Sequence, residues 1–475
     1  MASSAAATTT VTEPPSKPLL STYIDDFHHH SPPPSESDPS SSSHYPTSIT
    51  YNNHSNRPFK DLPFLLLFLL FLISTFSFGI FASINHNPNT PSSVSSFIYD
   101  IRTDSCIKDR ITDDNNNNRM CIGLLPVLLI PLVVIVIMVM VWIIVVNWSR
   151  VELTVRIIRV SADALSNNLG LFGVLPVMSL GLVAYFVPIV VFLVYARLNG
   201  EIVPREKRGK VVCEWEQDGW VPAYYALAIL TMLWSAAAMV EAQVYVISGT
   251  IAQWYFSKDD SRVKRSIRSS LRNAFGPSAG TICFSGLLIA VVRIVRGAVD
   301  TAANEDASGM INLVLRCCVN ALLSAFEFLN KFTINFAAIT GEAYCASARL
   351  TYELLRRNLL SAVVVEIVST RLLAAIVFVL SAIYAIVVCV ILKAATDLGV
   401  DSYFVAAVAF VLVLVILGFL VHVLDNVIDT VYICYAIDRD KGEVCKADVH
   451  DIYVNLPISR NHNPAYLNVR TPLLV

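Results

Sequence analysis

The apolar stretch 221–256 carries a row of polar and aromatic side chains on one helical face. Its members are separated by seven, four, three and seven residues: Trp234, Glu241, Tyr245, Ser248 and Tyr255. A carboxylate between two aromatic residues suits a quaternary ammonium ion, because ring faces attract cations and the carboxylate adds Coulombic attraction. The alternative is a packed helix interface, in which Glu241 is protonated or bonded to Gln243 or another neighbour.

A second polar face lies in the apolar stretch 403–435. Its members are spaced by three, four and three residues: His422, Asp425, Asp429 and Tyr432. Two acids one turn apart in apolar surroundings repel each other, so at least one is expected to hold a proton. His422, Asp425 and Asp429 are therefore candidates for a proton or cation relay. A solvated position near the end of the helix, or helix packing, is the alternative.

A third polar segment, FLNKFTINFAAITGEAYCASARLTYELLRRN, covers residues 328–358. Its Asn330, Asn335 and Tyr344 offer directional hydrogen bonds in an apolar setting, where unpaired polar groups are costly. Gly341 permits backbone geometry that other residues resist, so the segment from Asn335 to Tyr344 could line a break in the helix. The alternative is hydrogen bonding between helices, worth ~0.6 kcal/mol per bond on average. The substrate-binding candidates are Trp234, Glu241, Tyr245, Asn335 and Tyr344.

The sequence carries no motif that indicates catalysis. It has no nucleophile constellation and no GxSxG, HExxH, Walker A or GxGxxG pattern. It also has no CxxC, and the adjacent Cys317 and Cys318 point to different faces of a helix. A net charge of −2 gives no basic field for a nucleic-acid partner. We expect neither an enzyme nor a cofactor, metal site or nucleic-acid partner.

Composition indicates an integral membrane protein. Hydrophobic residues make up 55% of the chain, charged residues 15%, and the mean hydropathy is +0.58, all beyond the range of soluble proteins. Eight stretches are long enough to cross ~30 Å of hydrocarbon. They are approximately Leu62 to Ser83, Ile122 to Val146, Leu171 to Tyr195, Val221 to Phe256, Thr281 to Val299, Ile311 to Tyr344, Leu360 to Leu392 and Tyr403 to Tyr435.

Eight crossings place both ends of the chain on one side of the membrane. Arg57 and Lys60 precede the first stretch, and the connection 257–272 carries six basic residues, so the positive-inside rule places both termini in the cytosol. The connection 197–220, predicted to lie outside the cytosol, fits the rule less well, because it carries five basic residues, balanced by five acidic ones. Two stretches are long for one helix. The stretch Val221 to Phe256 either tilts and protrudes into the cytosol or breaks near Gly249, and the stretch Ile311 to Tyr344 could likewise break around Gly341 or Asn330.

The chain divides into three parts. Residues 1–60 are rich in Ser and Pro and are expected to form a disordered cytosolic tail. Residues 61–437 form the transmembrane domain, with extracytosolic loops at 85–120 and 196–220, and residues 438–475 form a cytosolic tail. Three cysteines lie in or beside the predicted outer loops, so one disulfide is plausible, with its pairing open: Cys106, Cys121 and Cys213.

Four ordered blocks of the sequence resemble the choline transporter-like family. The first is residues 328–358, with its FLNK, AITG and YCASAR motifs, and the others are WSAAAMVEAQVYVISGTIAQWYF (234–256), SIRSSLRNAFGPSAGTICFSGLLIAVVRIVRG (266–297) and DNVIDTVYICYAIDRDKG (425–442). The resemblance extends roughly from Cys121 to Pro457. In the seventh stretch the chain reads EIVSTRLLAAIVFVLSA, which departs from the family pattern and leaves the substrate less defined.

This resemblance implies an all-α, polytopic transmembrane helical bundle of about eight to ten membrane-spanning helices. It implies transport of choline or a related amine, by facilitated diffusion or cation/proton exchange through alternating access. The partners would be a small cationic amine and membrane lipid, in the plasma membrane or an organelle membrane. The competing hypothesis is a non-transporting membrane scaffold or trafficking protein that recruits partners through its disordered tail.

Overall fold

A computed structural model of the chain describes residues 57–85, 148–207, 210–257, 266–305, 310–395, 401–441 and 444–454. Most described residues are helical, which confirms an all-α membrane protein. The elements are α2 (Leu62–Ile84), α6 (Trp148–Ser166), α7 (Leu171–Arg197), β1 (Gly200–Lys207), β2 (Lys210–Gln217), α8 (Val221–Phe256), α9 (Ser266–Phe275), α10 (Ala279–Glu305), α11 (Met310–Thr340), α12 (Tyr344–Ala395), α13 (Asp401–Lys441) and α14 (Ala447–Val454).

Several predictions fall outside the described residues. These are the apolar stretch Ile122 to Val146, nearly all of the tail 1–60 and the loop 85–120 with Cys106 and Cys121. Cys213 lies in β2, where only the backbone is described. The disulfide prediction therefore stays a prediction.

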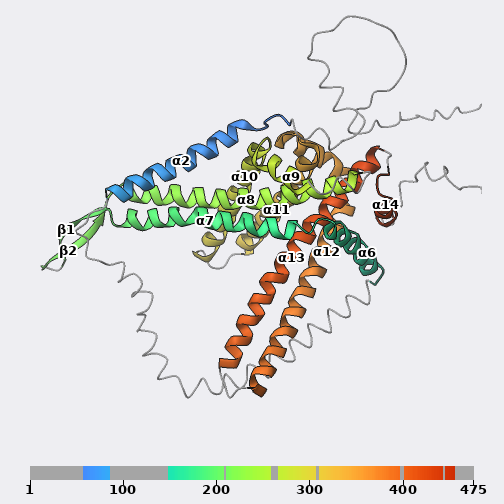
Figure 1. Ribbon diagram of the computed structural model, residues 1–475. Helices are drawn as coiled ribbons and strands as arrows, with labels where there is room; N and C mark the ends of the chain where they lie inside the picture. The colour runs from blue at the N-terminus through green and yellow to red at the C-terminus, as the bar shows by residue number, and fades with distance from the viewer. Residues whose placement is uncertain are drawn as a thin grey trace, which may run out of the picture.

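Helices α2, α7 and α8 run side by side, and the antiparallel β1–β2 hairpin extends from one end of this group (Figure 1). Small residues allow the close packing of α2 and α8, where the hydroxyls of Thr75 and Thr231 are 2.8 Å apart and buried. The hairpin was not expected from the sequence, because its alternating charged and apolar residues are few and lie between much stronger apolar signals.

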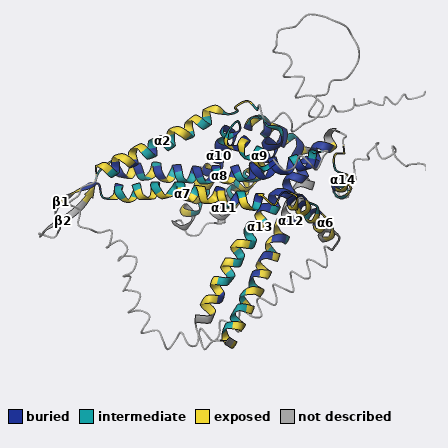
Figure 2. Cartoon of the chain, in the orientation of Figure 1, coloured by how far each residue is buried: buried dark blue, intermediate teal, exposed yellow. Residues whose placement is uncertain are grey.

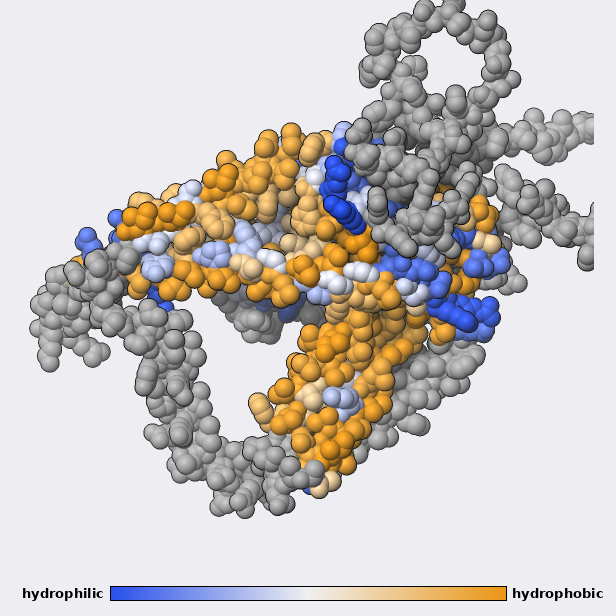
Figure 3. Space-filling view, viewed as in Figure 1, coloured by the Kyte–Doolittle hydropathy of each residue, from blue (hydrophilic) through white to orange (hydrophobic). Residues whose placement is uncertain are grey.

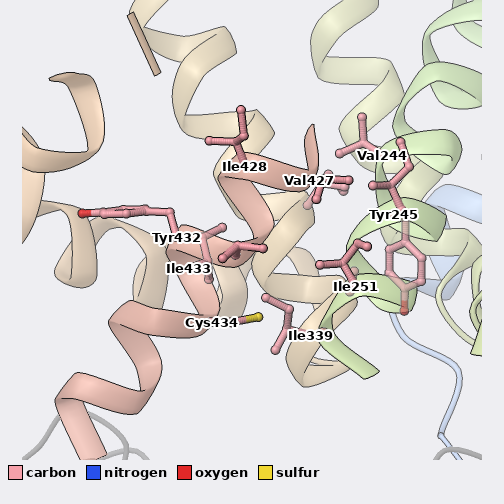
Figure 4. Packing of buried hydrophobic residues seen from close by; sticks show 14 of the residues in the cluster. Val244, Tyr245, Ile251, Ile339, Val427, Ile428, Tyr432, Ile433 and Cys434 are labelled. Atoms are coloured by element: carbon pink, nitrogen blue, oxygen red, sulfur yellow. The ribbon is translucent and has the colours of Figure 1, made fainter. Parts of the chain in front are cut away.

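Helix α8 is the central element of the core. It is continuous over 36 residues, about 54 Å at 1.5 Å per residue, so it has no break near Gly249. Aliphatic side chains of α8, α11 and α13 interlock around its second half (Figure 4). This region is also where buried residues concentrate in Figure 2. On another side α10 comes close, because a Cβ on Gly286 would lie 2.6 Å from the Cα of Ala238.

Helices α12 and α13 form a long hairpin that projects from this core (Figure 1). Figure 3 shows hydrophobic residues over its visible surface and over α2 and α7. Exposed apolar surface of this extent is typical of contact with lipid. By length and composition, six helical segments in the described part of the chain can cross a membrane: Leu62–Ile84, Leu171–Arg197, Val221–Phe256, Ala279–Thr301, Ser369–Ala394 and Tyr403–Arg439.

The stretch Ile311 to Tyr344 does break, at one of the two predicted places. Helix α11 runs through Asn330 without interruption and ends at Thr340. Gly341 then adopts φ +77°, a left-handed conformation that favours glycine, and α12 begins at Tyr344. The break therefore lies at Gly341. Its residues contribute to the polar site described below.

Three shorter helices were not predicted as elements. Helix α6 precedes α7, α9 begins within the predicted basic connection 257–272 and ends at Phe275, and α14 lies within the predicted tail 438–475. Tyr453 anchors α14, since its ring is fully buried and stacks on Tyr435 of α13. Burial raises the pKa of the Tyr453 phenol well above its ordinary value, so the phenol stays protonated. The beginning of the predicted tail therefore packs on the helical core.

Candidate functional site

Four helices bring together a buried polar cluster, the central cluster, formed by Glu241, Ser285, Asn330 and Tyr344. The Ser285 hydroxyl lies 3.1 Å from Oε2 of Glu241 and 2.9 Å from Oδ1 of Asn330. The Tyr344 hydroxyl donates to the same Asn330 oxygen at 2.6 Å. Every member is less than one tenth exposed. The break at Gly341 makes this possible, because it starts α12 where the Tyr344 phenol reaches back to α11.

No lysine or arginine among the described residues contacts the carboxylate of the central cluster. Glu241 forms no ion pair within 4 Å with any residue that the structure describes, and the neutral Ser285 hydroxyl donates a hydrogen bond to it at 3.1 Å. Desolvating a carboxylate is costly unless a cation or several donors compensate. The Asn330 side-chain amide nitrogen is also buried, with no acceptor among the described residues. The cluster thus presents an acceptor for a cation and a spare hydrogen-bond donor.

Two sequence-predicted residues flank the central cluster on α8. Trp234 is seven residues before Glu241, about 10 Å along the helix, where its indole donates to the Cys283 carbonyl at 2.9 Å. Its ring makes T-shaped contacts with Phe68 and Phe71 of α2. Tyr245 is one turn after Glu241, and its hydroxyl turns away from the aliphatic core (Figure 4). That hydroxyl lies 2.8 Å from the Ser278 hydroxyl.

Asn335 lies at a different junction. Its Oδ1 accepts a 2.7 Å hydrogen bond from Ser248 of α8, and Ser248 in turn accepts one from Thr430 of α13 at 3.0 Å. The Asn335 amide nitrogen is buried with no acceptor in the described part of the chain. The structure therefore joins Glu241 and Tyr344 through Ser285 and Asn330. It places Asn335 in a neighbouring junction of α8, α11 and α13.

The two acids of the predicted relay, Asp425 and Asp429, form ion pairs with a lysine. Lys331 of α11 lies 3.0 Å from Oδ2 of Asp425 and also contacts the carboxylate of Asp429. Thr370 of α12 donates to the other oxygen of Asp425 at 2.8 Å. The ammonium between the two acids offsets the repulsion on which the sequence argument relied. His422 lies three residues before Asp425 on α13, where its ring Nε2 is 3.4 Å from the Asn426 amide nitrogen and its backbone carbonyl accepts from that amide at 2.8 Å.

Sequence reasoning did not assign two contributors to these sites: Ser285 and Lys331. A signal for Ser285 was present, because Thr281 and Ser285 are four residues apart and so share one face of α10, with Ser278 directly before that helix. Lys331 stood out as a charge in an apolar stretch, but its partners come from α13, 94 residues away. No group of three or more potential metal ligands occurs among the described residues.

Comparison with known proteins identifies the family. The family described as plasma-membrane choline transporter matches residues 131–440, more than half of the chain. Choline transporter-like 2 of Anopheles gambiae is 24% identical over 271 residues, covering 54% of this chain and 34% of that protein. Choline transporter-like protein 2 of Dictyostelium discoideum is 22% identical over 310 residues, covering 63% of this chain and 49% of that protein.

A vertebrate relative shows a shorter and more similar match. Choline transporter-like protein 2 of Xenopus laevis is 29% identical over 149 residues, covering 30% of this chain and 21% of its own length. In each of these three comparisons the match spans less than half of the relative's length. The family match includes every helix of the central cluster and confirms the resemblance found in the four sequence blocks. The chain belongs to the plasma-membrane choline transporter family.

Proposed function

We propose that this chain carries choline or a related amine such as ethanolamine across the membrane, and that Glu241 binds the ammonium group. The observation that carries this proposal is the buried Glu241 carboxylate, which has no ion-pair partner among the described residues. A permanent cation would compensate the cost of burying that charge. The names of the relatives point to the same substrate class.

The residues around Glu241 suit the other parts of such a substrate. The Asn330 amide nitrogen would donate to the substrate hydroxyl, because it is buried and lacks an acceptor among the described residues. The aromatic rings of Trp234, Tyr245 and Tyr344 would contribute cation attraction of ~0.5 to 2 kcal/mol each where a face is presented to the ammonium. Asn335, with its spare amide, lies at the neighbouring junction of α8, α11 and α13.

Alternating access supplies the transport step in this proposal. The break at Gly341 separates α11 from α12 and allows the two helices to move relative to each other. An inside-negative potential would favour uptake of a monovalent cation by ~2.3 kcal/mol per 100 mV. Transport is facilitated diffusion or cation/proton exchange. His422, Asp425 and Asp429 are the proposed relay for the exchange mode, with Lys331 already bound to both acids.

The proposed topology has at least eight crossings. The six candidate spans, together with α11 and the apolar stretch Ile122 to Val146, make eight crossings. Both termini then face the cytosol, which agrees with the basic residues of the connection 257–272. The plasma membrane is the proposed location. The protein acts by moving its substrate and performs no catalysis.

The test is uptake of labelled choline into liposomes that contain the purified protein, under an imposed inside-negative potential. Saturable uptake that responds to the potential and is reduced by unlabelled choline or ethanolamine supports the proposal. Glu241→Gln removes the charge at nearly constant shape and should abolish uptake while the protein remains folded. Uptake by folded wild-type protein no greater than in empty liposomes would refute the choline proposal and favour the scaffold hypothesis.

A further inference from the structure

The five residues before α2, the strap (57–61), bind the beginnings of α10 and α12 and the loop between α11 and α12. The backbone N–H of Lys60 donates to the Pro277 carbonyl at 3.0 Å, and the Lys60 ammonium lies 3.4 Å from the Glu342 carboxylate. The Asp61 carboxylate accepts from the Thr281 hydroxyl at 2.7 Å and from the Tyr344 backbone N–H at 2.8 Å. The strap therefore joins the beginning of α10 to the loop between α11 and α12.

Asp61 has an unusual conformation that suits this role. Its φ of 53° and ψ of 36° are left-handed, which is uncommon for a non-glycine residue and tolerated best by Asn and Asp. Although Asp61 occupies the N-cap position of α2, its side chain makes no hydrogen bond to that helix. It caps the first N–H of α12 instead, where a negative charge is favoured by the helix dipole.

Arg57 places a positive charge beside the proposed substrate route. Its guanidinium donates to the Tyr245 hydroxyl at 2.9 Å and approaches the Ala338 carbonyl at 3.4 Å. It packs over Gly341, where an added Cβ would lie 2.8 Å from the guanidinium carbon. Tyr245 is one helical turn, about 6 Å, beyond Glu241. The guanidinium thus binds α8 one helical turn beyond Glu241, on the side that the positive-inside rule assigns to the cytosol.

The strap fits closely against α10. A Cβ added to Gly280 would lie 2.4 Å from the carbonyl oxygens of both Lys60 and Asp61. These are backbone atoms, so the strap itself would have to move. Gly297 is on the same helix and has nothing within 4 Å of an added Cβ. The chain therefore offers a substitution that displaces the strap and a matched one that leaves it in place.

We propose that the strap is the cytosolic gate of the transport route, with Arg57 as a tethered cation that closes the route below Glu241. The guanidinium repels an amine moving toward the cytosol, and it hydrogen-bonds to Tyr245, one of the residues proposed to receive that amine. Release then requires the strap to leave α10 and the α11–α12 loop. This inference rests on the proposed function only in calling the route a transport route.

The first test measures closure without any substrate. Ser278→Cys places a thiol next to Tyr245, at a position only 4% exposed. Its reaction with a polar thiol reagent is followed by mass spectrometry of the peptide that contains residue 278, so native cysteines do not interfere. Adding Gly280→Ala should speed the reaction roughly tenfold, because the overpacked strap shifts toward its open state. Adding Gly297→Ala should leave the rate unchanged, and equal rates in the two glycine variants would overturn the proposal.

A second pair of variants removes the charge without crowding the backbone. Arg57→Ala should speed the reaction at residue 278, whereas Arg156→Ala should not, since Arg156 is a mostly exposed arginine that pairs with Glu152 on α6. If Gly280→Ala does not fold, the comparison of Arg57→Ala with Arg156→Ala tests whether the strap closes the route. A rate for Arg57→Ala no faster than for Arg156→Ala would show that the strap does not close the route.

A third measurement links the strap to flux. Lys60→Cys with Glu342→Cys, joined by a bifunctional thiol reagent with a reducible linker, should lose choline uptake and regain it on reduction, while neither single variant responds. Unchanged uptake in the joined protein would refute a gate. Absence of choline uptake in the unmodified protein would instead refute the proposed substrate, and the reaction rates at residue 278 would still decide whether the strap closes the route.

Discussion

Lys331→Met should be strongly destabilising, because it leaves two buried acids facing each other. The methionine keeps most of the aliphatic length of lysine and removes the ammonium that contacts Asp425 and Asp429. The Asp429 side chain is 1% exposed, so water cannot replace the lost partner. Breaking a buried ion pair from one side costs about 3–5 kcal/mol. We expect a loss of this size in the free energy of unfolding.

The control is an exposed ion pair in the same protein. Arg316 and Asp300 lie 2.7 Å apart, but their side chains are 40% and 45% exposed. Solvent-exposed pairs contribute about 0.2–1 kcal/mol, so Arg316→Met should cost at most about 1 kcal/mol. Both variants would be compared by reversible unfolding of the purified protein in mixed detergent micelles, with helix content as the signal.

A double variant separates the charge from the packing. Adding Asp429→Asn to Lys331→Met removes the more deeply buried carboxylate charge, so part of the lost stability should return. The reasoning is refuted if Lys331→Met costs no more than Arg316→Met. It is equally refuted if Asp429→Asn restores nothing, since the loss would then come from packing.

Three further changes test other contacts. Gly286→Val should cost about 1–3 kcal/mol of unfolding free energy through overpacking against the α8 backbone, whereas Gly297→Val, with open space around it, should not. Asp61→Ala should cost about 0.5–2 kcal/mol through loss of the α12 cap, and hydrogen exchange at the Tyr344 amide should rise; unchanged exchange would contradict the cap. Trp234→Phe should lower the unfolding temperature through loss of the hydrogen bond to a buried carbonyl, and unchanged stability would contradict that role.

Strong and local signals in the sequence predicted much of the fold. The starts of α2, α7 and α8 follow from uniform apolar runs that begin at Leu62, Leu171 and Val221. Gly341, which ends α11, was one of two predicted break points, and its left-handed conformation interrupts the helix. The hairpin and the small helices α9 and α14 carry weaker signals, since their stability comes from packing or strand pairing rather than from a long apolar run.

The sequence predicted the polar residues of the candidate site within each helix, but not the contacts between helices. Glu241 and Tyr344 stood out as polar residues in apolar stretches, and the structure links them through Ser285 and Asn330. Periodicity could not show which helices contact each other, so the ion pair between Lys331 of α11 and Asp425 of α13 could not be predicted. For the same reason the contact between Arg57 and Tyr245, 188 residues apart, could not be predicted.

Binding of labelled choline at equilibrium tests the central claim most directly. It compares wild-type protein with Glu241→Gln and with Glu327→Gln, whose carboxylate pairs with Arg296 at a partly exposed site. We predict saturable binding by wild-type protein and by Glu327→Gln, and none by Glu241→Gln under conditions in which all three remain folded. Equal choline affinity in Glu241→Gln and wild-type protein would contradict the claim that this buried carboxylate binds the amine.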